Sequence, residues 1–296
     1  MTKRGTRYSA YLMTSVALMA TPAHAQGADA GTNADSDIIV TATKREQTLQ
    51  DVPVAVTVTD AATIQRANIT DIRDLQSVVP SLRVETRQNS VATNFFIRGF
   101  GNGANAAGIE PSVGVFIDGV YRSRSGAAIS DLNNIQRIEV LRGPQSTLFG
   151  KNASAGVISI VTREPEFEWS GKVEATLGNY DQRRLRGFLN VPISDDKAAL
   201  SVSLNRNLRD GYFKNNFNGQ TVNNIDRWSI AGDLLILPSD NMKIRIKGDY
   251  DRIDEDCCVV GELQAGLGNI LVPAFGGDPV DLDPYAYSVS QDITPT

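Results

Sequence analysis

Two patterns of apolar and polar residues divide this chain near residue 165. Beyond that point, apolar and polar residues alternate at a period of two, which places each kind on its own face of an extended strand. Strands with one apolar and one strongly polar face suit the wall of a transmembrane β-barrel, although an antiparallel sandwich in water would show the same alternation. The pattern predicts five strands, at residues 172–177, 184–191, 200–205, 228–236 and 243–250.

The connections between these strands differ in length. Residues 192–197 and 237–241 form tight turns, whereas residues 208–224 and the chain beyond 253 form long loops. Short periplasmic turns and long external loops are typical of outer-membrane barrels, and the short connection at 178–182 is an exception. Five strands cannot close, and an open edge in lipid would leave backbone groups unsatisfied. We therefore expect this chain to be the N-terminal portion of a longer protein with an incomplete barrel here.

Before residue 166 the pattern predicts short, mixed elements. Asp60 is a candidate N-cap for one helix and Thr70 or Asp71 for the next, which Pro80 would end. Gly99 would let the backbone pass close to another surface. The expected elements are strands at 53–58, 82–84 and 113–117, the last followed by a hairpin turn at 118–119, and helices at 61–67 and 70–79, the second burying Ile72, Leu75 and Val79 on one face.

Residues 135–165, IQRIEVLRGPQSTLFGKNASAGVISIVTREP, form the boundary between the two patterns. Apolar runs at both ends predict two strands, joined by a stiff turn rich in Gly with a short helix. Gly150 and Lys151 invite comparison with a phosphate-binding loop, but Gln145 and Asn152 stand where that motif requires Gly and Ser or Thr. A structural turn in a small α/β domain is the simpler interpretation.

The first 25 residues have the features of a secretory signal peptide. A positive start precedes an apolar core at residues 8–20, which is shorter than the about 20 residues that span a bilayer. Ala23-His24-Ala25 is a small-x-small cleavage site, so we expect cleavage after Ala25 rather than a retained signal anchor. His24 is the only histidine and would leave with the signal. The mature chain then has no histidine for a catalytic triad or a metal site, and we expect neither catalytic residues nor a metal site.

Charge and cysteine content narrow the function further. The formal net charge is −5 and no basic face is apparent, so nucleic acid is not an expected partner. Cys257 and Cys258 follow an acidic run in a predicted external loop. In an oxidising compartment they are disulfide candidates, either as a strained vicinal pair or through bridges to cysteines elsewhere, and metal binding by them is disfavoured.

A polar, aperiodic stretch at residues 26–36 is expected to be a linker. The seven residues that follow are rich in β-branched side chains: Asp37, Ile38, Ile39, Val40, Thr41, Ala42 and Thr43. They predict an extended segment with a free edge, which could add a strand to a partner's sheet. The alternative is the first strand of the domain that follows.

Four sequence motifs point to a known family. They are DVPVAVTV at 51–58, IRGFG at 97–101, VGVFIDGVYRSR at 113–124 and IEVLRGPQSTLFGKNASAGVISIVTREP at 138–165. Together they resemble the plug domain of TonB-dependent outer-membrane receptors, from about residue 37 to about residue 165. The resemblance implies an α+β plug domain at 47–165, followed by an antiparallel transmembrane β-barrel of about 22 strands. Residues 166–296 would supply only its first strands.

The resemblance also implies roles for single residues. The segment 37–43 would be the TonB box, within a linker at 26–46, which the TonB energy-coupling protein grasps. Arg98 and Arg142 would seat the plug against glutamates on barrel strands outside this sequence, unless they are ordinary surface arginines. Loop residues of the plug that could contact ligand, or could simply be solvated, are Arg87, Gln88, Asn89, Asn102 and Asn105.

By this resemblance the protein is a receptor of a Gram-negative outer membrane, a multi-pass β-barrel that imports a scarce nutrient such as a ferric siderophore. Its partners would be TonB, outer-membrane lipid and the small nutrient ligand, with no cofactor and iron present only in a transported ligand. Glycans or cobalamin are alternative substrates, and a non-transporting degenerate fragment is another alternative. A secreted hydrolase is disfavoured because the mature chain lacks histidine and a nucleophile motif, so we do not expect an enzyme. A passive pore or adhesin would have no use for the TonB box and plug.

Overall fold

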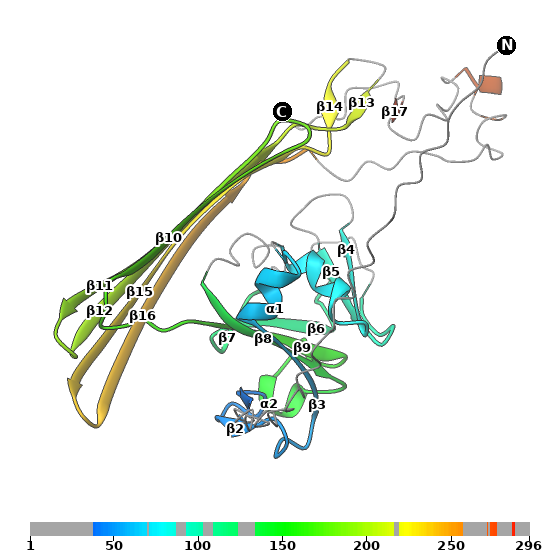
Figure 1. Ribbon diagram of the computed structural model, residues 1–296. Helices are drawn as coiled ribbons and strands as arrows, with labels where there is room; N and C mark the ends of the chain where they lie inside the picture. Colours follow the sequence, from blue (N-terminus) through cyan, green and yellow to red (C-terminus); the bar gives the residue numbers. More distant parts are fainter. Residues whose placement is uncertain are drawn as a thin grey trace, which may run out of the picture. The chain divides into compact units, whose positions relative to one another are not determined.

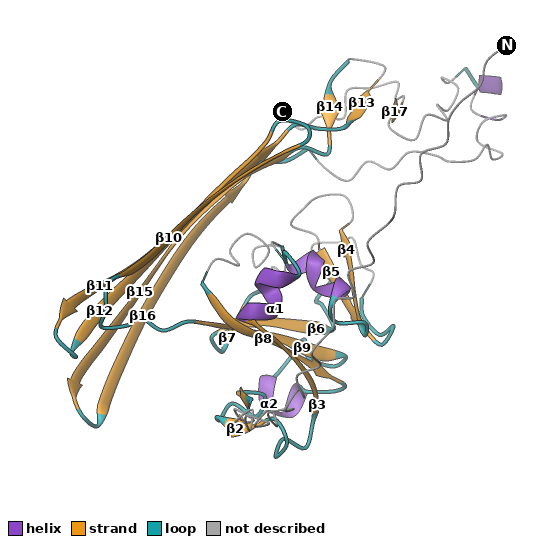
Figure 2. Ribbon diagram, in the orientation of Figure 1, coloured by secondary structure: helices purple, strands orange, loops and turns teal. Residues whose placement is uncertain are grey.

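The computed structural model describes residues 38–69, 71–86, 93–102, 109–123, 134–215, 219–256, 271, 273–276 and 286–287, all within the unit Ile38–Thr296. These residues contain a mixed sheet of short strands, followed along the chain by a long antiparallel sheet (Figure 1). The helices α1, η1 and α2 all belong to the part that precedes the long sheet (Figure 2).

The mixed sheet has the strand order β3-β8-β9-β6-β7. All its neighbouring strands are antiparallel except β6 and β9, which run parallel. Its core is formed by β-branched side chains of the two central strands, among them Ile138, Val140, Ile158 and Ile160, each at most 1% exposed. The bounds are β3 (Ala55–Asp60), β6 (Val113–Ile117), β7 (Val120–Tyr121), β8 (Ile135–Arg142) and β9 (Gly156–Thr162), with α2 (Ser146–Phe149) between β8 and β9.

Two short helices lie between β3 and the hairpin β4 (Leu82–Thr86) and β5 (Thr93–Ile97). Asp60 caps α1 (Ala61–Arg66) by accepting the Thr63 N–H at 2.8 Å. The second predicted helix is instead the 3₁₀-helix η1 (Ile72–Ser77), which begins at the N-cap Asp71 and ends two residues early. Pro80 disfavours helical geometry at the residue before it, which accounts for the early end. The predicted burial of Ile72, Leu75 and Val79 is confirmed.

The glycine after Arg98 has a different role from the one expected. Arg98 and Gly99 have φ values of 53° and 81°, and reciprocal hydrogen bonds of 2.9 and 3.0 Å join Ile97 and Phe100 across this tight turn. A Cβ on Gly99 would meet no atom within 4 Å, so the residue supplies a left-handed conformation rather than a close approach. The close approach occurs at Gly156, where a Cβ would overlap the Leu141 carbonyl oxygen.

The long sheet has the order β10-β11-β12-β15-β16, with every neighbouring pair antiparallel. All five predicted strands are present, but they extend further than their apolar runs, to 15 residues in β15. The loop at 208–224 contains β13 (Phe213–Asn215) and β14 (Thr221–Val222), and β17 (Ala286–Tyr287) pairs with β13. The bounds are β10 (Ser170–Gly178), β11 (Gln182–Ser194), β12 (Ala198–Arg209), β15 (Ile225–Ser239) and β16 (Met242–Ile253).

The two faces of the long sheet are exposed in the opposite sense to those of a soluble protein. The polar face is covered over β12 and β15, where Ser201, Ser203, Asn205, Asn207 and Asp233 are all buried. The apolar face is open, with large side chains exposed at Val173, Leu177, Leu185, Leu189, Leu204, Ile230 and Ile246. A sandwich in water would bury the second face, so this arrangement favours contact with lipid. Within the described part of the chain, no helix is both long and apolar enough to cross a membrane.

Candidate functional site: the seam between the sheets and the N-terminal strand

Charged side chains on β16 join the long sheet to the mixed sheet. Lys243, Arg245, Lys247, Asp249 and Asp251 occur at every second residue, so they share one face of the strand. The face is therefore cationic at its start and anionic at its end. We call these residues and their partners across the gap the seam.

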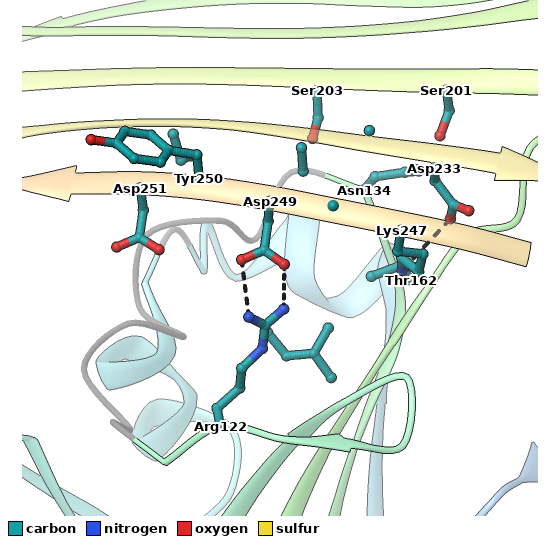
Figure 3. A pocket seen from close by; sticks show the side chains of 15 residues that line it. Arg122, Asn134, Thr162, Ser201, Ser203, Asp233, Lys247, Asp249, Tyr250 and Asp251 are labelled. Atoms are coloured by element: carbon teal, nitrogen blue, oxygen red, sulfur yellow. Dashed lines mark hydrogen bonds and ion pairs between the residues drawn. The ribbon is translucent and has the colours of Figure 1, made fainter.

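The anionic end of the seam holds Arg122, which lies directly after β7. Its guanidinium donates two parallel hydrogen bonds to the Asp249 carboxylate, at 2.9 and 2.5 Å (Figure 3). This geometry is the bidentate pairing in which Arg and carboxylates interact most strongly. The hydrogen bonds to Asp249 and its negative charge raise the pKa of Arg122, despite partial burial.

Side chains at the cationic end of the seam bind the turn after β6 and the chain at the end of β9. Lys247 donates to the Asp118 carboxylate and, at 2.5 Å, to the Thr162 hydroxyl. Asp118 also accepts the Thr162 N–H at 2.9 Å. Asp118 has φ 47° and the following glycine φ 80°, so the predicted hairpin turn is confirmed. The turn directs a carboxylate at the long sheet.

Arg245 and Lys243 bind the same part of the chain, at residues 162–164. Arg245 donates to Thr162 Oγ1 at 3.0 Å and to the Arg163 carbonyl oxygen at 3.2 Å, while a bidentate pair with Asp233 fixes its own position. Lys243 donates to both Glu164 oxygens, at 2.7 and 2.6 Å. The first residues after the mixed sheet are therefore held by side chains of the strand β16.

A second contact between the two parts lies at the N-terminus of η1. Arg227 on β15, 3% exposed, approaches Asp71 at 3.3 Å and forms a bidentate pair with Glu255 at 2.5 and 3.1 Å. Burial acts to lower the pKa of Arg73, but its hydrogen bond with Asp71 and the negative charges of Asp71, Glu255 and Asp74 together raise that pKa. The side chains of Arg227 and Glu255 are almost completely removed from water, so their charges must neutralise each other.

Clefts lie between the long sheet and the elements that precede it in the described part of the chain. The first, beside the Arg122–Asp249 pair, has a volume of about 80 Å³ and is lined by Ser201, Ser203, Ser229 and Asp251 (Figure 3). It is much smaller than the roughly 300–1,000 Å³ of small-molecule sites, so it suits water rather than a ligand. The second, about 410 Å³, lies between α1 and the strands β10 and β11. Its size falls within the range of small-molecule sites.

The N-terminal segment is docked onto the mixed sheet. Val40 and Ala42 are fully buried, whereas Ile38 and Ile39 are 51% and 42% exposed. β1 (Ile39–Val40) pairs with β2 (Gln47–Thr48), and the Thr43 hydroxyl donates to Gln47 at 2.8 Å. The Thr41 N–H donates to the Glu139 carboxylate at 2.9 and 3.1 Å, and the Thr41 hydroxyl donates at 3.1 Å. We call residues 38–43 the docked segment; Asp37 lies outside the described residues.

The other residues singled out from the sequence are not brought together. The Arg98 side chain is exposed, and Arg142 Nε is buried without a hydrogen-bond partner in the described part of the chain. Their seating role stays a prediction. Asn102 is bonded within its own loop, through Glu110 and Ser112. Its ligand contact also stays a prediction, and Arg87, Gln88, Asn89, Asn105, Cys257 and Cys258 lie outside the described residues.

Sequence reasoning missed the seam itself. Arg122 and Asp118 both lie in the motif at 113–124, but their partners on β16 are 127 and 129 residues away. Glu139 was also missed. A carboxylate between Ile138 and Val140, in a strand that is otherwise apolar, was the available signal.

Comparison with known families identifies this architecture. A family model described as the TonB-dependent receptor plug domain matches residues 48–157. The chain belongs to the TonB-dependent receptor family. From here we call the elements β1 to β9 the plug, and the sheet β10-β11-β12-β15-β16 the wall.

Relatives of the chain come from at least two bacterial genera. The pesticin receptor of Yersinia pestis is 31% identical over 216 residues, which cover 73% of this chain and 30% of that protein. The iron-regulated outer membrane virulence protein of Vibrio cholerae is 30% identical over 191 residues, which cover 58% of this chain and 27% of that protein. The chain therefore spans 30% or less of the length of these curated relatives.

Solved structures agree with the fold. The ferric yersiniabactin uptake receptor of Yersinia pestis matches with a TM-score of 0.62 and 30% identity, over 67% of this chain and 31% of that one. A siderophore receptor from Acinetobacter baumannii matches over 83% of this chain and 32% of that one, with a TM-score of 0.60 and 16% identity. The plug and the open, incomplete wall are thus the fold of TonB-dependent receptors.

Proposed function

We propose that the protein takes up a ferric siderophore across the outer membrane of a Gram-negative bacterium, driven by TonB. Membership of a receptor family supports a transporter rather than an enzyme. The names of two relatives support the substrate class, since one is a ferric yersiniabactin uptake receptor and the other is iron-regulated. Iron would enter only as part of the transported ligand.

The observation that carries this proposal is the inverted exposure of the wall. An apolar face open to the outside and a polar face joined to a plug support a transmembrane wall with the plug on its inner side. Opening a wall that is blocked by a plug requires energy. The N-terminal segment is a place where a partner protein could apply force to the plug. Pulling on residues 37–43, the proposed TonB box, would load the plug at the strand that holds this segment.

Deleting residues 37–43 tests the proposal. We expect uptake of radioactive iron from its siderophore complex to be abolished in iron-limited cells, while binding of the complex to those cells stays unchanged. Deleting residues 28–34 of the linker is the matched control, because it removes the same length and leaves the box. Loss of binding along with uptake would refute this division of labour.

The substrate class is tested separately by growth. Cells that depend on this receptor should grow on a ferric siderophore as the only iron source, and should gain nothing in cobalamin or glycan uptake. Uptake of cobalamin or a glycan without any ferric siderophore would refute the substrate and leave the receptor class in place.

A further inference from the structure

Glu139 is a fully buried carboxylate at the centre of the plug. It lies on β8, which pairs with β3 on one side and β9 on the other. Glu139 and Leu141 share one face of β8, and Leu141 belongs to the apolar cluster that contains Val40 and Ala42. The carboxylate therefore points from the sheet toward the docked segment.

The donors around this carboxylate come mainly from one residue of the docked segment. Thr41 supplies its N–H to both oxygens and its hydroxyl to one of them. Arg137 Nε supplies the remaining described bond, at 2.8 Å. If the segment leaves, a carboxylate with no exposure to water loses every donor but that guanidinium. Unsatisfied buried charges are costly, so the satisfaction of Glu139 is coupled to docking of the segment.

The contact between Thr41 and Glu139 also blocks the edge of β1 that does not pair with β2. The Leu49 N–H bonds to the Ile38 carbonyl oxygen at 2.8 Å, so the backbone groups of residues 38 and 40 face β2. In an antiparallel ladder the groups of residues 39 and 41 then face the other edge. There the Thr41 N–H is bonded to Glu139, and the Thr41 carbonyl oxygen accepts the Lys44 N–H at 2.8 Å. A strand added from a partner would find both backbone groups of Thr41 occupied.

We propose that Glu139 is a positioning residue that keeps the docked segment closed to its partner in the resting receptor. The clasp between Glu139 and Thr41 sets how often the segment is released, and both backbone groups of Thr41 stay occupied while the clasp is closed. This inference rests on the proposed function, because it takes residues 37–43 to be the TonB box.

Amide hydrogen exchange in the purified, ligand-free receptor tests the clasp without any coupling protein. In Glu139→Gln the side chain keeps its shape but loses its charge and presents an NH₂ group to donors. Hydrogen bonds to a charged acceptor correspond to roughly 10- to 100-fold in an equilibrium constant, so peptides over residues 38–43 should exchange faster by about that factor. The control is Glu110→Gln, an exposed carboxylate paired with Lys151, for which the exchange should not change.

Peptides over β9 separate release of the segment from unfolding of the plug. If they keep wild-type protection while residues 38–43 exchange faster, the clasp is supported; unchanged exchange at 38–43 overturns it. If Glu139→Gln also unprotects β9, Thr41→Val decides. That variant loses only the hydroxyl bond, and it should speed exchange in the docked segment alone by a smaller factor. No change in Thr41→Val would then overturn the proposal.

A binding measurement separates this inference from the proposed function. The isolated periplasmic domain of TonB should bind ligand-free Glu139→Gln more tightly than the wild type, by about the factor measured in exchange. Faster exchange with unchanged affinity would leave the clasp in place but refute the assignment of these residues as the TonB box.

Discussion

Two lysines on β16 offer a matched test of how the wall holds the plug. Lys247 and Lys243 lie on the same face of the same strand, and each donates to a plug carboxylate. They differ in burial: the Lys247 and Asp118 side chains are 30% and 13% exposed, whereas those of Lys243 and Glu164 are 51% and 44% exposed. Replacing each lysine by methionine keeps most of the side-chain volume and removes the ammonium group, with its charge and its hydrogen-bond donors.

The expected effects follow from this difference in burial. Losing a hydrogen bond to a charged, mostly buried acceptor costs about 1.5 kcal/mol, at the low end of the usual range because Lys247 is partly solvated. An exposed ion pair contributes about 0.5 kcal/mol or less. With a urea dependence of about 2 kcal/mol per molar, Lys247→Met should lower the midpoint of plug unfolding by about 0.7 M, and Lys243→Met by less than about 0.3 M.

Pulse proteolysis in urea, with the receptor in detergent, measures these midpoints through cleavage of the unfolded plug. The double variant Lys247→Met/Asp118→Asn should recover part of the loss, because asparagine tolerates the φ of 47° at that turn and leaves no unpaired charge. High salt should remove the effect of Lys243→Met and keep that of Lys247→Met. Equal shifts for the two lysines would refute the argument that burial at the seam decides its strength.

Three further outcomes follow from the packing. Gly156→Ala should destabilise the plug by about 1–3 kcal/mol in the same assay, because its Cβ would overlap backbone, whereas Gly248→Ala on the wall, with nothing within 4 Å, should not. Ile246→Lys should reduce the amount of receptor assembled in outer-membrane fractions, since a charge on the lipid face costs about 2–4 kcal/mol at the bilayer midplane; normal assembly would contradict a lipid contact. Amide exchange in β3 should outpace that in β9, and the reverse order would count against opening from the edge of the sheet.

The alternation of apolar and polar residues predicted the wall strands, because a barrel strand places every second side chain on the same face over many residues. Alternation at 200–205 placed Leu204 and Ser203 on opposite faces, and the structure exposes the first and buries the second. The same pattern could not show which environment each face meets, since exposure depends on what covers the polar face. The wall strands are longer than the alternating segments that predicted them. Backbone pairing continues where apolar and polar side chains no longer alternate, as at Pro192 in β11.

Pairings between distant charges lay beyond sequence reasoning for a related reason. Arg122 and Asp249 each have an ordinary local sequence, and only the register of β16 against the plug brings them together. The second helix was overextended because its apolar spacing suited a regular helix, while a capping box at its start and the proline at position 80 restricted it to the six residues of η1. Burial of its apolar face was still predictable, because that depends on spacing alone.

The chain order of the plug suggests how a pull could open it without detaching it from the wall. After the docked segment come β2 and then β3, which is the edge strand of the mixed sheet and pairs only with β8 within it. Once the Glu139 clasp opens, tension therefore reaches an edge strand first, and an edge strand can separate while β8 and β9 stay paired. The residues held by β16 lie at the end of β9 and directly after it, at Thr162 and Glu164. The pull thus reaches β3 on one side of β8, whereas the seam holds β9 and the turn after β6 on the other side of β8, so the plug can yield at one edge while the seam keeps the rest in place.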